Sequence, residues 1–346
     1  MGIGRTLRRA QWALIGLGLA ADAAQDTPDL SAEERPQFWY GGQAVIEGVM
    51  MRGQYVAAVS VRHPAGAIVT REVPLNAALY RGRIARLPFV RGLVLLWDAL
   101  GLGTRALMWS ADVAMEEEEE IDFSLQGAAG AGLVVLSLAL GIGLFFVLPA
   151  AISAGIQHVL GFESRLLADG IEGVVKLALL VGYIWAIGLM PDVKRLYGYH
   201  GAEHKTINAY EDGAELMPEI TKTYSLEHPR CGTAFLLTLV VLSVLIHMLT
   251  GRPDSLPLLL LSRVGLIFPI AGIAYEVLRF TAAHVEHPVI RVLIKPNLAL
   301  QHLTTREPDR WMRAVGIAAL KHVLDAERMG EPLPEPRVST EAVPTD

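Results

Sequence analysis

The chain has one cysteine, few charged side chains and no nucleotide-binding motif. Because only Cys231 among its 346 residues is a cysteine, an intramolecular disulfide framework is excluded. The sequence contains neither a Gly-Lys-Ser/Thr phosphate loop nor a dinucleotide-binding glycine fingerprint. It also has no basic patch interleaved with aromatic residues, and its formal net charge is −6. Nucleic acid is therefore not an expected partner.

Low charge is matched by a high apolar content. Charged residues make up 19% and hydrophobic residues 52% of the chain, and the mean hydropathy is +0.37. A soluble domain of this size would carry more charge, so we expect part of the surface to face a lipid bilayer. Four segments are long and apolar enough to cross it: residues 133–152, 171–190, 234–249 and 256–278.

The distribution of lysine and arginine predicts the orientation. The loop of residues 191–230, between the second and third spans, contains five of them: Lys194, Arg195, Lys205, Lys222 and Arg230. The other two loops each contain a single arginine. The positive-inside rule then places this loop and both termini in the cytoplasm.

The regions outside the spans are expected to differ in structure. Residues 1–37 are read as an amphipathic surface helix and a linker, with a signal peptide or disorder as alternatives. Residues 38–122 are predicted to form a cytoplasmic α+β region. Its period-2 alternation over residues 55–62, a turn at 63–66 and a return at 67–73 indicate an antiparallel hairpin or sheet.

Further helices are predicted on either side of the spans. Residues 87–111 carry Arg91, Asp98 and Arg105 seven residues apart, as expected of an interfacial helix. The glutamates at 116–120 are read as a solvated helix start without a catalytic role. The four spans occupy residues 123–280, residues 281–329 form a cytoplasmic helical region with a helix at 308–327, and residues 330–346 are expected to be disordered.

The sequence His200-Gly-Ala-Glu203-His204 carries the clearest chemical signal. Histidines four residues apart lie on one face of a helix and can bind one cation. The His-x-x-Glu-His spacing is that of inverted zinc peptidases.

Other polar residues complete this prediction. His228, Cys231 or Glu211 would supply a third ligand to zinc or another divalent metal. Glu203 would act as a base and Arg230 would stabilise an oxyanion. The alternative is that the histidines only pair with carboxylates near the membrane and that Cys231 fills apolar space.

Two charged residues lie within the fourth predicted span. Arg263 and Glu276 are 13 residues apart, roughly 20 Å along a helix, and so cannot pair with each other. Glu276 can reach Arg279. Ionisable groups in hydrocarbon are costly, so each is either structural or part of a polar pathway. His158 and His247, near the ends of spans, are read as interfacial.

Five motifs occur in an order that resembles the YqhQ family of bacterial multi-spanning membrane proteins, which carry a domain of unknown function. The resemblance covers residues 40–326. Its motifs are Gly41-Gly-Gln-Ala-Val-Ile-Glu-Gly-Val-Met-Met-Arg-Gly53, Tyr199-His-Gly-Ala-Glu-His-Lys205, His228-Pro-Arg-Cys-Gly-Thr233, Tyr275-Glu-Val-Leu-Arg279 and Leu303-Thr-Thr-Arg-Glu-Pro-Asp309. The family is provisionally labelled a metal-dependent enzyme. The resemblance therefore singles out Glu47, His200, Glu203, His204, His228 and Cys231.

Together these observations predict a four-span α-helical bundle with a small cytoplasmic α+β portion before the first span. The expected activity is metal-assisted hydrolysis at the cytoplasmic face of a bacterial inner membrane. One alternative is a non-enzymatic accessory or scaffold protein of membrane-protein insertion, secretion or quality control. A small transporter using Arg263 and Glu276 is a further alternative, although the four spans show no internal repeat.

Overall fold

The computed structural model describes residues 40–80, 82, 87–115, 128–251, 253, 255–329 and 335–342. The chain divides into two units, Met1–Gln37 and Phe38–Asp346, and only the second contains described residues. The predicted N-terminal helix and the glutamates at 116–120 lie outside these ranges.

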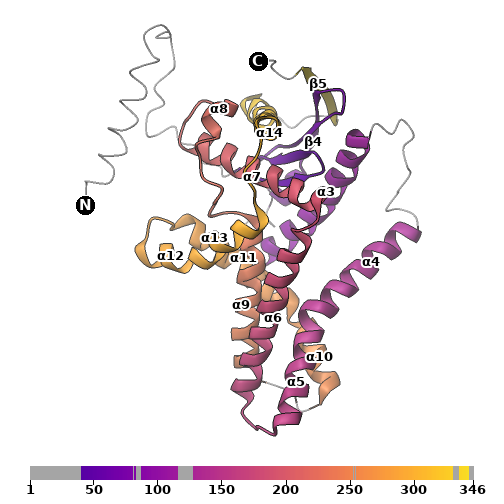
Figure 1. The fold of residues 1–346 in the computed structure, drawn as a ribbon, viewed down its shortest axis with the longest axis vertical. Helices are drawn as coiled ribbons and strands as arrows, with labels where there is room; N and C mark the ends of the chain where they lie inside the picture. Colours follow the sequence, from indigo (N-terminus) through magenta and orange to yellow (C-terminus); the bar gives the residue numbers. More distant parts are fainter. Residues whose placement is uncertain are drawn as a thin grey trace. The chain divides into compact units, whose positions relative to one another are not determined.

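The chain forms a five-stranded antiparallel sheet, and four of its strands precede the first span, as the sequence predicted (Figure 1). Its order is β1-β2-β3-β4-β5. The strands are β1 (Gly41–Val45), β2 (Gly48–Arg52), β3 (Val56–Arg62), β4 (Ala67–Pro74) and β5 (Arg337–Ala342). The first four follow each other in a meander because short turns connect them.

Helices cover both faces of this sheet. Alternate side chains of a strand point to opposite faces, so Met51 packs in the cluster of α14 (Arg310–Met329). Met50 packs instead with Leu102 and Ala106 of α3 (Val90–Met115). Every residue of β2 except Arg52 is therefore buried.

The last strand was not expected. The prediction that the tail after residue 330 is disordered is wrong for Arg337–Ala342, which pairs with β4. Glu72 of β4 is only 2% exposed, and it accepts hydrogen bonds from Arg337 and from His322 of α14. These contacts attach a polar strand, which has few apolar residues of its own, to the edge of the sheet.

Four membrane-spanning helices are found at the predicted places. The spans are Val135–Leu160, Arg165–Ile187, Gly232–Thr250 and Leu256–Ala283. The first contains the second half of α4 (Ala128–Ile142), the π-helical turn η2 (Gly143–Val147) and α5 (Leu148–Leu160). Helices α6 (Arg165–Ile187) and α9 (Gly232–Thr250) form the next two, and α10 (Leu256–Gly265) and α11 (Ile267–Ala283) form the last. Most of their outward side chains are apolar, and Leu249 is 86% exposed, as suits a helix surrounded by lipid.

The segments between and after the spans form further helices. These are α7 (Pro191–Glu211), α8 (Pro218–Thr221), α12 (Pro288–Leu293), α13 (Lys295–Thr304) and α14, whereas α2 (Ala77–Tyr80) lies before the spans, between β4 and α3. Tyr199 and Ile207 of α7 share a buried cluster with Val315 of α14 and Val49 of β2. The sheet, α7 and α14 therefore lie on the same side of a membrane that the four helices cross (Figure 1).

The helix at residues 90–115 links the sheet to the last span. Gly92 of α3 approaches Tyr275 of α11 closely. Arg91 forms an ion pair with Glu276, so the expected partner of Glu276, Arg279, is replaced by a residue of another helix. Further along α3, Asp98 accepts a hydrogen bond from Tyr80 at 2.5 Å. The predicted charged stripe thus contacts other elements at two of its three positions, and the third, Arg105, donates to the carbonyl oxygen of Gly101 in its own helix.

Candidate metal centre

Helix α7 carries the two histidines of the central motif. It begins at Pro191, a residue favoured at a first helical position because it lacks the N–H that would go unpaired there. It continues without a break through His200 and His204. The two imidazole rings lie 4.4 Å apart between centroids. The predicted shared helix face is therefore present.

Two glycines in α7 allow other segments to approach it. A Cβ at Gly198 would lie 2.7 Å from Sδ of Met312, and one at Gly201 would lie 2.1 Å from the backbone oxygen of Arg306. Both distances are far shorter than a carbon atom tolerates. These glycines therefore let α14 and the segment after α13 pack directly beside the histidines.

Cys231 meets the histidines from the start of α9. Its Sγ lies 3.2 Å from Nε2 of His200. One nitrogen of each of His200 and His204 and the sulfur of Cys231 lie within 4.8 Å of one another. Cys231 is the N-cap of α9, and its sulfur accepts a hydrogen bond from the backbone N–H of Thr233. Two nitrogens and one sulfur are ligands that zinc prefers.

Backbone carbonyls set the orientation of both rings. Nδ1 of His200 is 2.8 Å from the carbonyl oxygen of Thr304, and Nδ1 of His204 is 2.5 Å from that of Leu226. A carbonyl can only accept, so each Nδ1 carries the proton and each Nε2 offers a lone pair. Metal-binding histidines are usually fixed in this way. In the described part of the chain, Nε2 of His204 is buried and has no hydrogen-bond partner.

Glu203 lies beside these donors in a buried position. It is 5% exposed, and its Oε2 has no hydrogen-bond partner among the described residues. Burial raises the pKa of its carboxyl, while His200, His228 and the backbone N–H of Gly42 oppose the shift. A raised pKa brings a carboxylate closer to the basicity that a general base requires near neutrality.

His228 and Arg230 lie outside the group formed by His200, His204 and Cys231. Nε2 of His228 faces Arg230 at 3.3 Å and Glu211 at 3.8 Å. Burial lowers the pKa of His228 to about 4, against the influence of Glu203, so its ring is neutral at pH 7. Arg230 forms an ion pair with Glu211, and burial lowers its pKa to about 10.

Glu47 lies apart from the donors, at the start of α7. It occupies a left-handed backbone conformation with φ 51° in the turn between β1 and β2. Its carboxylate pairs with Arg195 and accepts a hydrogen bond from Tyr199 at 3.1 Å. Although burial opposes the shift, Arg195 lowers the pKa of Glu47. Glu47 and Arg195 line a cavity of about 410 Å³ with Arg62, His63, Pro64 and Ala114.

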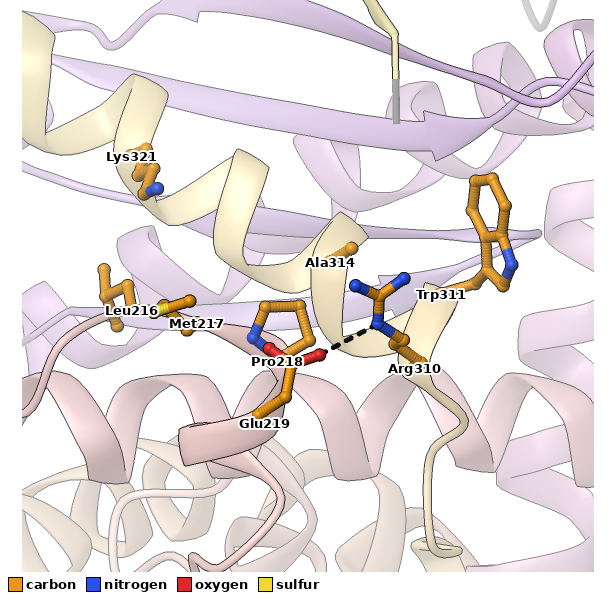
Figure 2. A pocket seen from close by; sticks show the side chains of 8 residues that line it. All are labelled: Leu216, Met217, Pro218, Glu219, Arg310, Trp311, Ala314 and Lys321. Atoms are coloured by element: carbon orange, nitrogen blue, oxygen red, sulfur yellow. Dashed lines mark hydrogen bonds and ion pairs between the residues drawn. The ribbon is translucent and has the colours of Figure 1, made fainter. Parts of the chain in front are cut away.

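A second cavity, of about 260 Å³, lies between α8 and α14 (Figure 2). It is lined by Leu216, Met217, Pro218, Glu219, Arg310, Trp311, Ala314 and Lys321. Arg310 and Glu219 form an ion pair of 2.9 Å across it. His200, His204 and Cys231 line neither of these two cavities.

Two residues near the donors escaped prediction. Gln301 is fully buried and makes two hydrogen bonds of 2.9 Å to the backbone of His228. Thr304 supplies the carbonyl that orients His200. Both belong to α13, and each is more than 70 residues beyond the histidine that it contacts. Only the motif at residues 303–309, which includes Thr304, indicated that this segment takes part.

Gly201→Ala should destabilise the protein by about 1–3 kcal/mol, as overpacking of a well-packed interior does. The added carbon would meet Leu226 at 2.8 Å as well as Arg306, and Leu226 holds His204. We therefore expect metal affinity to fall too. The measurement is reversible unfolding in mixed micelles, with Gly182→Ala as control because nothing lies within 4 Å of a Cβ there. Equal stability of the two variants would contradict the packing argument.

Fold and site together define a multi-spanning α-helical membrane protein with a largely buried His-His-Cys cluster at the side of the bundle that carries the sheet. Comparison with known proteins identifies the family. Residues 87–326 match the model of the protein family of unknown function DUF1385. The chain is also 32% identical over 302 residues to the uncharacterized protein YqhQ of Bacillus subtilis (strain 168), covering 84% of this chain and 94% of that protein. The chain belongs to this YqhQ-like DUF1385 family.

No solved structure matches the chain. The arrangement of the sheet, the spans and the cluster is therefore described from this structure alone.

Proposed function

We propose that the protein is a metal-dependent hydrolase that holds zinc or another divalent ion with His200, His204 and Cys231. The observation that supports this most is the convergence of three ligand atoms within 4.8 Å. Both imidazoles are also held in the tautomer that offers Nε2. A core packed only for stability would not need a buried histidine, a half-buried histidine and a buried thiol at one point.

The residues around the cluster suit hydrolysis. Three protein ligands leave a tetrahedral ion one free position, as in catalytic zinc sites, where the ion supplies Lewis acidity to a water or a substrate carbonyl. Glu203 would accept the proton of the attacking water, since burial raises the pKa of its carboxyl. His228 is neutral and adds no charge that would repel a cation.

We place this activity at the cytoplasmic face of a bacterial inner membrane, with both termini in the cytoplasm. The positive-inside rule supports this orientation because the loop at 191–230 carries five basic residues. A reducing compartment also suits a metal-binding thiol. Substrates bound here would be peptides or lipid-linked molecules that reach the membrane surface.

The test begins with metal content. The full chain, purified in detergent, should contain or take up one equivalent of a divalent metal, measured by elemental analysis. His204→Asn and Cys231→Ser should lose it, because each removes one of three ligands. His302→Asn should keep it, since that histidine is 60% exposed and pairs with Glu227.

The same preparations test the reaction. Hydrolysis of p-nitrophenyl acetate in micelles should appear with the metal and disappear with a chelator. Metal retained in both ligand variants, or a wild-type chain that binds none, would refute the metal centre. Stoichiometric metal without hydrolysis would favour a structural ion, and with it the accessory or scaffold alternative.

A further inference from the structure

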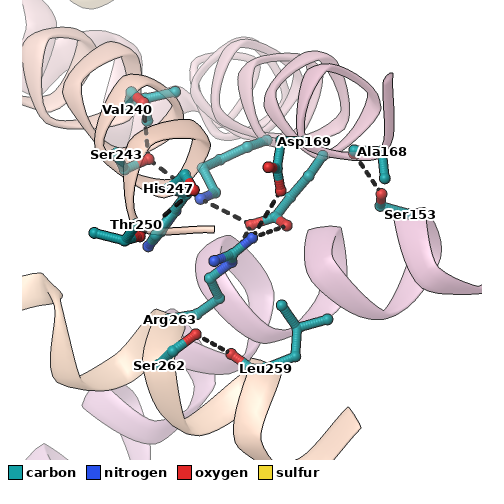
Figure 3. Close-up of polar contacts among 12 residues, drawn as sticks. Ser153, Ala168, Asp169, Val240, Ser243, His247, Thr250, Leu259, Ser262 and Arg263 are labelled. Carbon is teal, nitrogen blue, oxygen red and sulfur yellow. Dashed lines mark hydrogen bonds and ion pairs between the residues drawn. The ribbon is translucent and has the colours of Figure 1, made fainter. Parts of the chain in front are cut away.

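A second polar cluster lies inside the bundle, away from the proposed metal centre. It consists of Asp169, Glu172, Lys176, Ser243, His247 and Arg263, from α6, α9 and α10 (Figure 3). Each of these side chains is at most 3% exposed, and Arg263 is 0% exposed. His247, expected at the membrane interface, is instead buried at 1%. It is 16 residues beyond Cys231 on the same helix, roughly 24 Å.

Arg263 is held tightly by two carboxylates. Its Nε and Nη2 each donate to Glu172 at 2.9 Å, and Nη2 also donates to Asp169 at 3.0 Å. Lys176 lies 3.6 Å from Glu172 and donates to Ser243 at 3.2 Å. Among these six side chains two carboxylates face two basic groups, and His247 adds no charge while its ring is neutral.

Hydrogen-bond donors remain in excess. Within the described residues, Nη1 of Arg263 and both ring nitrogens of His247 are buried without a hydrogen-bond partner. Nη1 carries two N–H groups, and a neutral imidazole has one donor and one acceptor. Three donors therefore face one acceptor. Buried polar groups in hydrocarbon are rarely left this way, since each unmade bond is costly.

We propose that this cluster binds a small monovalent anion together with a proton on His247. A small anion accepts hydrogen bonds from the N–H groups of Arg263 and His247, and it has no donor group of its own. An anion alone would add a negative charge in a low-dielectric environment, where each added charge is expensive. A proton on His247 compensates that charge and turns the one remaining acceptor into a fourth donor. We therefore expect the anion and the proton to bind together.

The groups that face His247 favour this coupling. Lys176 of α6 donates to Ser243 of α9 and pairs with Glu172, and Glu172 and Asp169 hold Arg263 of α10. Figure 3 shows Asp169, Ser243 and Arg263 in the same region as His247. The remaining titratable groups of α6 are Arg165, one turn before Asp169, and Tyr183, two turns after Lys176. Those of the other helices packed on α9 lie towards its opposite end: Tyr275, Glu276 and Arg279 of α11, and Lys295 and His302 of α13. Without an anion, Arg263 and Lys176 repel a proton on His247. A bound anion cancels that repulsion.

Chloride is the probe, titrated into the purified full chain by calorimetry between pH 5 and pH 7. Two buffers of different ionisation enthalpy give the number of protons taken up. We expect saturable binding with an uptake approaching one proton per chain, and none with gluconate, which is too large. His247→Gln should abolish the proton uptake and weaken chloride binding at least tenfold. His158→Gln, an exposed histidine on α5, is the control and should behave like the wild type.

Three results would overturn the proposal: no saturable chloride binding by the wild-type chain, binding without proton uptake, or an unchanged response in His247→Gln. Circular dichroism and elution volume show whether His247→Gln is folded. Because the metal donors lie at the other end of α9, metal content in the same samples reports separately on the proposed hydrolase.

Discussion

Arg263→Leu should destabilise the helix bundle by about 3–5 kcal/mol, the usual cost of removing one partner of a buried ion pair. Asp169 and Glu172 would lose all three hydrogen bonds from the guanidinium and leave a net negative charge among buried side chains. The measurement is reversible unfolding in mixed micelles, followed by circular dichroism. Arg279→Leu is the matched control, because that arginine is exposed in the same span and should change stability by less than about 0.5 kcal/mol.

A compensating variant separates charge imbalance from loss of packing. Adding Glu172→Gln to Arg263→Leu restores the net charge of the wild-type cluster, because one negative and one positive side chain are then removed together. We expect the double variant to recover at least half of the lost stability. If it is as unstable as Arg263→Leu, the arginine acts mainly through its volume, and the electrostatic account of the cluster is wrong.

Hydrophobic runs made the spans predictable, because a membrane requires about 20 apolar residues for each crossing. The meander was predictable because alternation and turn residues are local signals. β5 was not. Its sequence, Arg-Val-Ser-Thr-Glu-Ala, is as polar as a disordered tail, and it is ordered by pairing with β4, more than 260 residues away in sequence.

The candidate metal site could likewise be predicted only in part. Helix periodicity alone brings His200 and His204 together, and the structure has them on one face. The choice between His228 and Cys231 depends on how the loop before α9 folds, which the spacing did not determine. In the structure Cys231 faces His200, whereas His228 faces Arg230.

The partners of Arg263 could not be predicted either, because they lie on a helix that is distant in sequence. Asp169 and Glu172 are more than 90 residues away. A polar residue in a span indicates that a partner exists, but it does not show on which helix the partner lies.

Glu203→Gln should change activity and stability in opposite directions. If the metal centre is correct, hydrolysis of p-nitrophenyl acetate should fall by about 10²–10⁴-fold, the contribution of a positioned general base. The variant should retain its metal, because Glu203 is not among the three converging donors. Loss of metal together with activity would instead make Glu203 a ligand.

The metal-free variant should be more stable than the metal-free wild type at high pH. Burial raises the pKa of Glu203 in the folded chain, so the folded wild type holds a proton that the unfolded chain has already lost. Its stability therefore decreases as the pH rises from the ordinary glutamate pKa through the folded value. Glutamine has no charge to bury.

The difference in free energy of unfolding between metal-free Glu203→Gln and the metal-free wild type should be near zero at pH 4. It should reach about 3 kcal/mol at pH 9, since an unsatisfied buried charge costs at least as much as a neutral polar group. Unfolding in mixed micelles across this range measures it. Zinc should reduce the difference, because a cation beside the carboxylate favours its charged form. A difference that does not depend on pH would show that burial does not control this carboxyl. If zinc leaves the difference unchanged, Glu203 lies too far from the ion to accept a proton from water bound to it.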